Sequence, residues 1–390
     1  MKIPITKPYF DDEEKQLVWG ALDRGWVVQG PNVAEFERKF AEYSGVTFGM
    51  ATTSCTTALH LSLIALGIGD GDEVIVPAFS FVATANSVEY QSAKPVFVDI
   101  DLRTFNMDVS QLEEKITPRT KAIMPVALFG LSADMNPILE LARKHNLKVI
   151  EDAACGIGAW YHGRHAGTMS DFGAVSFHPR KAITTGEGGM VLTSNPEWAA
   201  LIRSLRDHGA TTSDLQRHTQ QRSFLLPDYP RVGYNYRMTD VQGAIGVAQM
   251  GKLEYILDRR RELARYYDQA LGGTPQLCTP HTPDGYLHGY QSYVCLFVPE
   301  KPTMDNVDLL HEMRNNLMAA LEDQGIATRQ GTQAIHIQEF YRRKYGYQPS
   351  DYPRTYIADR LTLALPLYPQ MTTEEQAYVV ENLKQELSRL

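Results

Sequence analysis

The sequence predicts an α/β protein with a mostly parallel sheet covered by helices on both faces, followed by a smaller α+β domain. From about residue 46 onward, short β-branched runs alternate with amphipathic segments. The runs are apolar almost throughout, as expected for parallel strands buried on both faces. After about residue 239 the alternation gives way to long helical stretches. We therefore expect two domains, residues 1–250 and 251–390.

Local patterns justify each element in turn. An early helix is predicted because Val33, Phe36, Phe40 and Tyr43 recur at helical spacing before Gly45. The predicted strands of the large domain are 46–52, 73–77, 95–100, 122–128, 148–154, 172–178 and 189–194. The predicted helices between them include 109–116 and 136–146. The second half is predicted to contain a long helix at 239–271, a strand at 292–299, a helix at 308–325 and a final helix from 373.

Composition narrows the class of protein. The chain has 390 residues, of which 43% are hydrophobic and 22% charged, which is typical of a soluble globular enzyme. The net charge is −8 and there is no Lys/Arg block, so we expect no binding to DNA or RNA. The four cysteines form no CxxC pair, and no apolar run of about 18 residues is present, so neither a metal site nor a membrane span is expected. Because the N-terminus is acidic, the predicted location is the cytoplasm.

Polar residues follow several of the predicted strands. In open α/β sheets, ligands bind beyond the carboxyl ends of the strands. Asp152 stands at the end of one strand, Lys181 follows another, and an aromatic and hydroxyl cluster around Phe81 follows a third. The residues at 53–57 form a hydroxyl-rich turn before a helix. We therefore expect a ligand site at this edge of the sheet.

Each of these residues has two interpretations. The hydroxyls at 54–57, with Thr56 and Thr57 among them, can bind a phosphate at the helix N-terminus, or they can only cap the helix. Lys181 in a partly dry cleft loses preference for its charged form and becomes a better Schiff-base nucleophile, whereas a solvated surface lysine is inert. Asp152 can pair with a protonated ring nitrogen or cap a turn. Phe81 can stack on a ring or pack in the core.

Six ordered blocks of the sequence resemble one family. They are residues 25–37, 54–88, 149–159, 176–189, 233–246 and 363–375. Together they are similar to the sugar aminotransferases of the DegT–DnrJ–StrS group, which are fold-type-I enzymes dependent on pyridoxal 5′-phosphate (PLP). The resemblance implies a three-layer PLP transferase fold and a homodimer with active sites at the subunit interface.

The resemblance also implies roles for individual residues. Lys181 would hold PLP as a Schiff base, Asp152 would pair with its pyridine nitrogen, and Phe81 would stack on its ring. The expected phosphate contacts are Thr56, Thr57, Ser176 and, from the partner subunit, Asn235. The candidates for substrate contacts are His178, Trp26, Arg237 and His336, with Arg180 and Arg237 as candidates for the donor carboxylate. His336 can equally have a structural role.

Two residues depart from the family pattern. Cys55 stands where a glycine often precedes the phosphate-binding threonine, and Cys155 stands where Gln or His often lies near the 3-oxygen of the cofactor. We expect both to leave activity intact, with Cys155 having a modest effect on the cofactor's electronics.

The expected reaction is a ping-pong transfer of an amino group from L-glutamate to a nucleotide-linked keto sugar, by default a 4-keto-6-deoxy hexose, in amino-sugar and polysaccharide biosynthesis. The alternatives are a PLP-dependent sugar dehydratase, which would carry histidine in place of Lys181; a cysteine desulfurase, which would need a cysteine on a mobile loop; and a catalytically idle regulator or scaffold.

Overall fold

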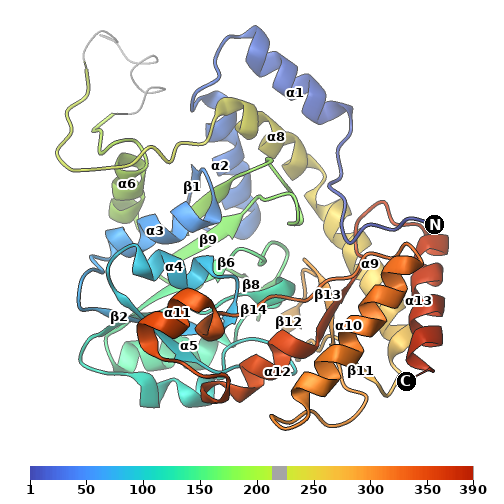
Figure 1. The fold of residues 1–390 in the computed structure, drawn as a ribbon. Helices are drawn as coiled ribbons and strands as arrows, with labels where there is room; N and C mark the ends of the chain where they lie inside the picture. Colours follow the sequence, from blue (N-terminus) through green and yellow to red (C-terminus); the bar gives the residue numbers. More distant parts are fainter. Residues whose placement is uncertain (213–225, 390) are drawn as a thin grey trace.

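The computed structural model describes residues 1–212 and 226–389, and a seven-stranded sheet forms the centre of this part of the chain (Figure 1). The order is β1-β10-β9-β6-β5-β2-β4, in which β10 alone runs against the others. The bounds are β1 Phe48–Thr52, β10 Gly189–Thr193, β9 Phe172–Ser176, β6 Lys148–Ala153, β5 Thr120–Ile123, β2 Glu73–Pro77 and β4 Lys94–Val98. The sheet is therefore mostly parallel, as predicted.

Helices cover both faces of this sheet, which gives the three layers expected from the sequence. Val74 and Val76 of β2 pack into a core with α3 (Cys55–Ala65), α4 (Ala83–Glu89) and α6 (Pro196–Leu205). Ile75, between them, faces the opposite core, which contains α5 (Met135–Lys144). Near β1 and β10, the same face is covered by α2 (Pro31–Ser44), which packs on α8 (Asp240–Gly251). Because successive side chains of a strand point to opposite faces, a continuously apolar strand serves both cores.

The C-terminal half builds a smaller antiparallel sheet, which lies beside four helices. Its strands are β11 (Leu277–Cys278), β13 (Tyr293–Phe297) and β15 (Thr362–Leu365). The helices are α9 (Leu253–Leu271), α10 (Val307–Asp323), α12 (Pro353–Leu361) and α13 (Thr373–Leu387). The chain's start joins this half, because the Ile3 amide donates to the Gly325 carbonyl at 2.8 Å. The domain boundary near residue 250 stays a prediction.

A short antiparallel ladder ties the two halves together. β14 (Gln333–Ala334) comes from the C-terminal half and pairs with β3 (Phe79–Ser80), which follows β2. α11 (Glu339–Tyr345) then packs near α4, where the Tyr341 hydroxyl donates to Asn86 at 2.6 Å. A three-stranded sheet, β12-β7-β8, lies elsewhere on the surface (β7 Trp160–Tyr161, β8 Arg164–His165, β12 Tyr286–Leu287). The α1 helix (Asp12–Asp23) projects from the top of the molecule (Figure 1).

Three predicted elements differ from the structure. Residues 109–116 form two 3-10 turns (Val109–Gln111 and Glu113–Lys115) instead of a helix, since Pro118 follows and disfavours continuation. The predicted helix 239–271 is two helices, broken at Lys252, whose φ of −118° and ψ of 9° are not helical. The strand at 122–128 ends at Ile123, before Pro125, which has no N–H to donate. Among the described residues, no helix combines the length and apolar character needed to cross a membrane.

Candidate active site

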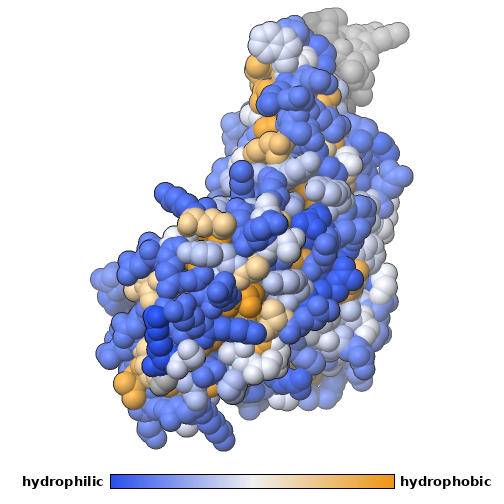
Figure 2. Space-filling view, turned by 90° about the vertical axis from the view of Figure 1, so that its right-hand side faces the viewer, coloured by the Kyte–Doolittle hydropathy of each residue, from blue (hydrophilic) through white to orange (hydrophobic). Residues whose placement is uncertain are grey.

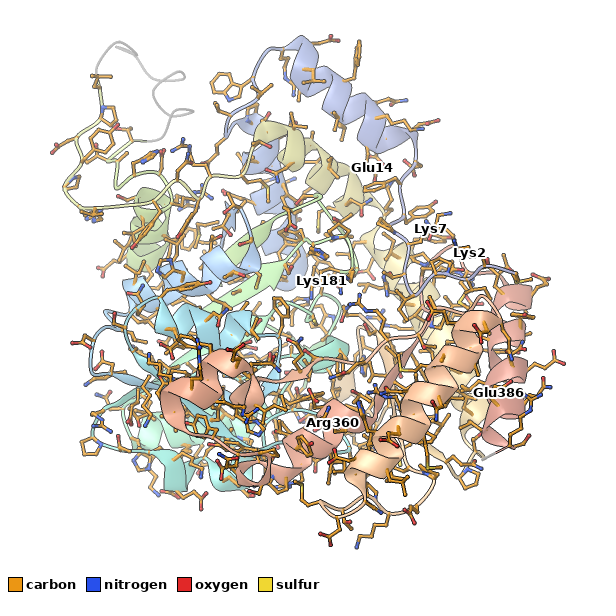
Figure 3. All side chains as sticks on the ribbon, viewed as in Figure 1. Lys2, Lys7, Glu14, Lys181, Arg360 and Glu386 are labelled. Carbon is orange, nitrogen blue, oxygen red and sulfur yellow. The ribbon has the colours of Figure 1, made fainter. Side chains whose placement is uncertain are left out.

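A cavity of about 490 Å³ opens at the carboxyl ends of the parallel strands, where the large sheet meets the C-terminal half. The large sheet and its loops contribute Ser54, Cys55, Thr56, Phe81, Asp152, Cys155, Ser176, His178, Arg180 and Lys181 to its wall. The C-terminal half contributes Gln291, Ser292, Arg329, Thr332 and Leu365, among others. Figure 3 shows Lys181 at the centre of the molecule, between these two parts.

Lys181 lies in the loop after β9, and its amine reaches into the cavity. The Nζ atom donates to the Sγ atom of Cys155 at 3.1 Å. Burial lowers the pKa of Lys181, but the contact with Cys155 and the charge of Asp152 outweigh burial, so the net direction is upward. From the sequence we expected a lowered pKa for Lys181, because burial was considered and the neighbouring Cys155 thiol was not.

Asp152 lies near the end of β6 and is 4% exposed. One carboxylate oxygen accepts from the Thr84 hydroxyl at 2.7 Å, and the other accepts from the Ala154 amide at 3.1 Å. The Ser80 and Thr84 hydroxyls lie 2.8 Å apart. Because Thr84 donates its proton to Asp152, Ser80 must donate to Thr84. Burial raises the pKa of Asp152, while Thr84, Ala154 and Lys181 act in the other direction.

The N-terminus of α3 borders the cavity and supports both interpretations made from the sequence. Ser54 caps the helix, and the Thr57 hydroxyl completes the capping box by accepting from the Ser54 amide at 3.1 Å. Thr56, by contrast, lines the cavity, as does Ser176 at the end of β9. β10 passes so close that a Cβ on Gly189 would lie 2.3 Å from the carbonyl carbon of Ser54. A glycine at this position lets the helix N-terminus, with its unpaired N–H groups, reach the site.

Phe81 is exposed although it is a large aromatic residue. It is 64% exposed and lines the cavity, so it does not pack in the core. An exposed ring on the wall of a cavity is available to stack on a planar ligand. This distinguishes it from its neighbour Phe79, which is fully buried.

The structure brings His178 and Arg180 to the cavity but leaves the other proposed substrate contacts outside its wall. The His178 ring accepts from the Arg180 amide at 3.2 Å, and burial lowers its pKa. Arg237 forms an ion pair with Asp207 at 2.6 Å. Trp26, in the loop between α1 and α2, donates to the Gln29 carbonyl at 3.2 Å.

Asn235 and His336 also lie outside the cavity wall. Asn235 is exposed, and its backbone bridges to Asp207. His336 is fully buried against the Tyr352 ring, with centroids 4.9 Å apart, and burial lowers its pKa to about 4. This position gives His336 a structural environment, the second of the two roles considered for it.

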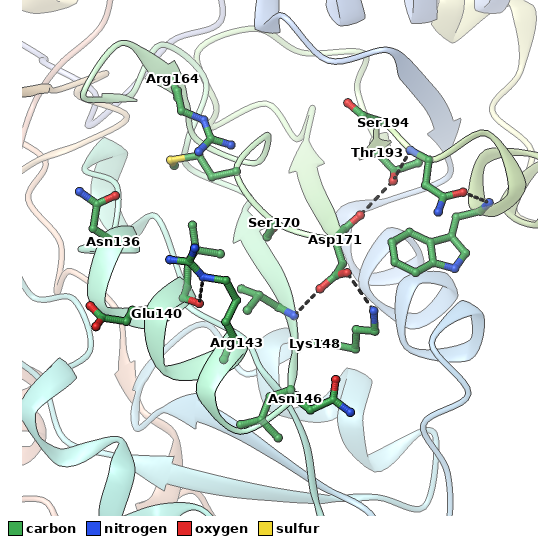
Figure 4. Close-up of a pocket in the computed structure, with 17 residues that line it drawn as sticks. Asn136, Glu140, Arg143, Asn146, Lys148, Arg164, Ser170, Asp171, Thr193 and Ser194 are labelled. Atoms are coloured by element: carbon green, nitrogen blue, oxygen red, sulfur yellow. Dashed lines mark hydrogen bonds and ion pairs between the residues drawn. The ribbon is translucent and has the colours of Figure 1, made fainter.

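A second, larger hollow of about 820 Å³ lies at the other ends of the strands (Figure 4). Lys148, the first residue of β6, lines it and pairs with Asp171 at 3.3 Å, whereas Asp152 lies near the opposite end of the same strand. Its other charged groups include Arg143 and Glu140 on α5. None of the residues predicted to bind a ligand lines this hollow. The chemistry expected from the sequence therefore belongs to the smaller cavity.

Comparison with protein-family models gives a match over residues 8–384, to the DegT/DnrJ/EryC1/StrS aminotransferase family. The chain belongs to this family. Its members are PLP-dependent aminotransferases that act on sugars, so the protein is an enzyme of that kind and PLP is its cofactor.

Relatives match over nearly the full length. GDP-perosamine synthase of Caulobacter vibrioides is 42% identical over 342 residues, which is 87% of each chain. The spore coat polysaccharide biosynthesis protein SpsC of Bacillus subtilis is 38% identical over 98% of this chain and 96% of its own. The putative sugar aminotransferase Spr1654 of Streptococcus pneumoniae, solved in its PMP form, matches with a TM-score of 0.91 and 28% identity, with all of both chains covered.

The residues that line the cavity of this family member suit PLP. The cavity offers an amine at Lys181, a buried carboxylate at Asp152, an exposed ring at Phe81 and a helix N-terminus for a phosphate. Sequence reasoning missed Thr84, which donates to Asp152, and Arg329, which lines the wall. It placed Ser80 in the cluster around Phe81 but did not predict that Ser80 bonds to Thr84. Thr84 lies inside the block 54–88 that resembles the family, but its partner is 68 residues away, and no spacing pattern signals that contact.

Proposed function

We propose that this enzyme transfers the amino group of L-glutamate to a nucleotide-linked keto sugar, by default a 4-keto-6-deoxy hexose, in amino-sugar and polysaccharide biosynthesis. The observation that carries the proposal is the shared cavity of Lys181 and Asp152, with Phe81 and the α3 N-terminus on its wall. The names of the relatives support the substrate class, since one is a GDP-perosamine synthase and another a polysaccharide biosynthesis protein.

Lys181 and Asp152 divide the chemical work. Bound PLP supplies an aldehyde that reacts with amines and a ring that accepts the electron pair left when a proton leaves a carbon. Lys181 would hold the cofactor through its Nζ atom, and its amine, once freed, would accept the proton that leaves the α-carbon of the donor and later return it. Asp152 would hold the ring nitrogen in its protonated form.

Other side chains bind and orient. Thr56, Ser176 and the first amides of α3 would hold the phosphate at the edge of the sheet. Phe81 would stack on the ring. Thr57 stabilises the α3 N-terminus through its capping bonds, and it would bind the phosphate itself only if that cap rearranged. Cys155 lies 3.1 Å from the Lys181 amine, and it would lie near the 3-oxygen of the cofactor.

The proposed enzyme is a cytoplasmic homodimer in which each subunit completes its partner's site. Exposed large apolar side chains support this: Trp19 and Leu22 on α1 are 66% and 51% exposed, and Val232, in the segment before α8, is 88% exposed. Figure 2 shows hydrophobic side chains on the projecting upper part of the molecule. Asn235 is exposed and lies three residues after Val232, and it would reach the cofactor phosphate in the partner subunit. Trp26, Arg237 and His178 remain candidates for sugar-nucleotide contacts. The four cysteines are free, as expected in a reducing compartment.

Absorption spectra and product analysis test the function. L-glutamate should convert the enzyme-bound cofactor from the PLP to the pyridoxamine form, and a nucleotide-linked 4-keto hexose should reverse the change. NMR of the product then identifies the aminated carbon. Lys181→Ala should abolish turnover. Lys144→Ala, which changes an exposed side chain on α5, should keep it. Steady turnover by Lys181→Ala, or a PLP-loaded wild-type enzyme that glutamate leaves unchanged, would contradict the proposal.

A further inference from the structure

Two arginines reach the same cavity from opposite halves of the chain. Arg180 directly precedes Lys181, and Arg329 comes from the segment that bridges to Ala364 in β15. Neither guanidinium forms an ion pair with any carboxylate of residues 1–212 and 226–389. By contrast, Arg206 pairs with Glu37 at 2.5 Å and Arg237 pairs with Asp207 at 2.6 Å. The cavity thus contains two guanidinium groups that no carboxylate of the described residues pairs with, although Glu187 and Asp152 also line its wall.

These two groups repel each other. Burial lowers the pKa of Arg329, and the positive charge of Arg180 lowers it further. Like charges that face one cavity without a counter-ion are unfavourable, and an anion between them would relieve the repulsion. Guanidinium groups bind carboxylates and phosphates with two parallel hydrogen bonds, which makes arginine suited to such a role.

The backbone holds both arginines in place before any ligand binds. The Ala364 amide donates to the Arg329 carbonyl at 2.7 Å, and the Gln330 side chain donates to Asp359 at 3.0 Å. The Gln291 side chain, from the C-terminal half, donates to the Arg180 carbonyl at 2.9 Å. With the backbone of each arginine fixed, less conformational entropy is lost when an anion binds.

The substrates carry two anionic groups that two arginines could bind, the α-carboxylate of the amino donor and the diphosphate of the sugar nucleotide. The position of the arginines favours the carboxylate. The donor amine reacts at Lys181, the chain neighbour of Arg180, and the α-carboxylate of the donor is one bond from the amine-bearing carbon. The diphosphate of a nucleotide sugar is attached across the sugar ring from a 4-keto carbon, so it lies farther from the reacting atoms. A site next to Lys181 therefore suits the carboxylate.

We propose that Arg180 and Arg329 together bind a carboxylate of the amino donor. The proposal rests on the proposed function, since it needs an amino acid donor at Lys181. It assigns Arg329, which the sequence argument did not consider, to the binding of the first substrate. It also gives Arg180 priority over Arg237, whose guanidinium is paired with Asp207.

Separate measurements of the two half-reactions test this assignment. In PLP-loaded enzyme, Arg329→Gln and Arg180→Gln should each raise the apparent Kd for L-glutamate roughly tenfold or more, as expected for the loss of a charged hydrogen bond. Reaction of the pyridoxamine form with the keto-sugar nucleotide should change less than threefold by comparison. Arg329→Lys, which keeps the charge but loses the fork, should fall between Gln and wild type. Arg342→Gln, on exposed α11, is the matched control.

Calorimetry with glutarate, an unreactive dicarboxylate, gives a readout that is independent of turnover. Both Gln variants should weaken glutarate binding by a similar factor. Unchanged glutarate and glutamate affinity in both variants would overturn the proposal, as would a loss confined to the sugar-nucleotide step, which would assign the pair to the diphosphate. If wild-type enzyme binds glutarate through these arginines but glutamate does not react, the proposed function fails while the carboxylate site stands.

Discussion

Replacement of Thr84 by Val should lower the rate of the first half-reaction, with glutamate, without removing the cofactor. Thr84 is fully buried, and its hydroxyl donates to Asp152 at 2.7 Å. Valine keeps the shape but removes the donor, so one oxygen of a buried carboxylate loses its partner. A hydrogen bond to a charged group contributes about 1.5–3 kcal/mol. If the whole contribution acts on the transition state, the rate with glutamate falls roughly ten- to a hundredfold.

Stopped-flow absorption with L-glutamate measures this rate directly in PLP-loaded enzyme. Thr84→Ser keeps the hydroxyl and should stay near wild type, which separates the hydrogen bond from packing. Ser87→Ala, on the same helix, removes a hydroxyl that bonds only to the Thr84 carbonyl and serves as a second control. A Thr84→Val enzyme with the wild-type rate and spectrum would show that the Ser80–Thr84 pair does not orient Asp152, and the reasoning would be wrong.

Three further predictions concern Asp152, Cys155 and Gly189. Burial raises the pKa of Asp152, so the stability that this group contributes to the apoenzyme is full below its unfolded pKa, near 4, and declines as pH rises. Between pH 5 and pH 8, Asp152→Asn should therefore lose less stability than wild type in urea unfolding, although it loses activity. The same pH dependence of stability in both proteins would contradict this. Cys155→Gln should shift the absorption maximum of the bound cofactor and change kcat by no more than roughly tenfold, and an unchanged spectrum would place Cys155 away from the 3-oxygen. Gly189→Ala should weaken PLP binding, because its Cβ would overlap the backbone of the α3 N-terminus, and should destabilise the fold by about 1–3 kcal/mol, whereas Gly69→Ala, with open space around it, should do neither in the same PLP titration.

The large sheet was predictable because its signals are local. A strand such as 73–77 is short and continuously apolar, and the residues that follow neighbouring parallel strands must meet at one edge of the sheet. This is why Asp152, Ser176 and Lys181 line one cavity as the sequence implied. The direction of β10 was not predictable, since periodicity carries no information on which way a strand runs.

The parts that the sequence did not predict depend on contacts between distant residues. β14 pairs with β3 across about 250 residues, and two-residue strands have no periodicity to detect. Arg329 lies next to that ladder, so its place on the cavity wall was hidden for the same reason. The pKa of Lys181 was predicted in the wrong direction because the approach of Cys155 to 3.1 Å follows from tertiary structure alone. The role given to Asn235 involves a second chain.

The ladder between β14 and β3 has a consequence for the order of events during synthesis. The cavity wall contains Arg329 and Leu365 as well as Asp152 and Lys181. A nascent chain that has folded only the large sheet therefore has an open cleft in place of this cavity. Contacts separated by so much chain form slowly, because a long loop must close first. Closure of the cavity should therefore be a late event for this polypeptide, and fragments that stop before residue 334 should lack the wall that Leu365 provides.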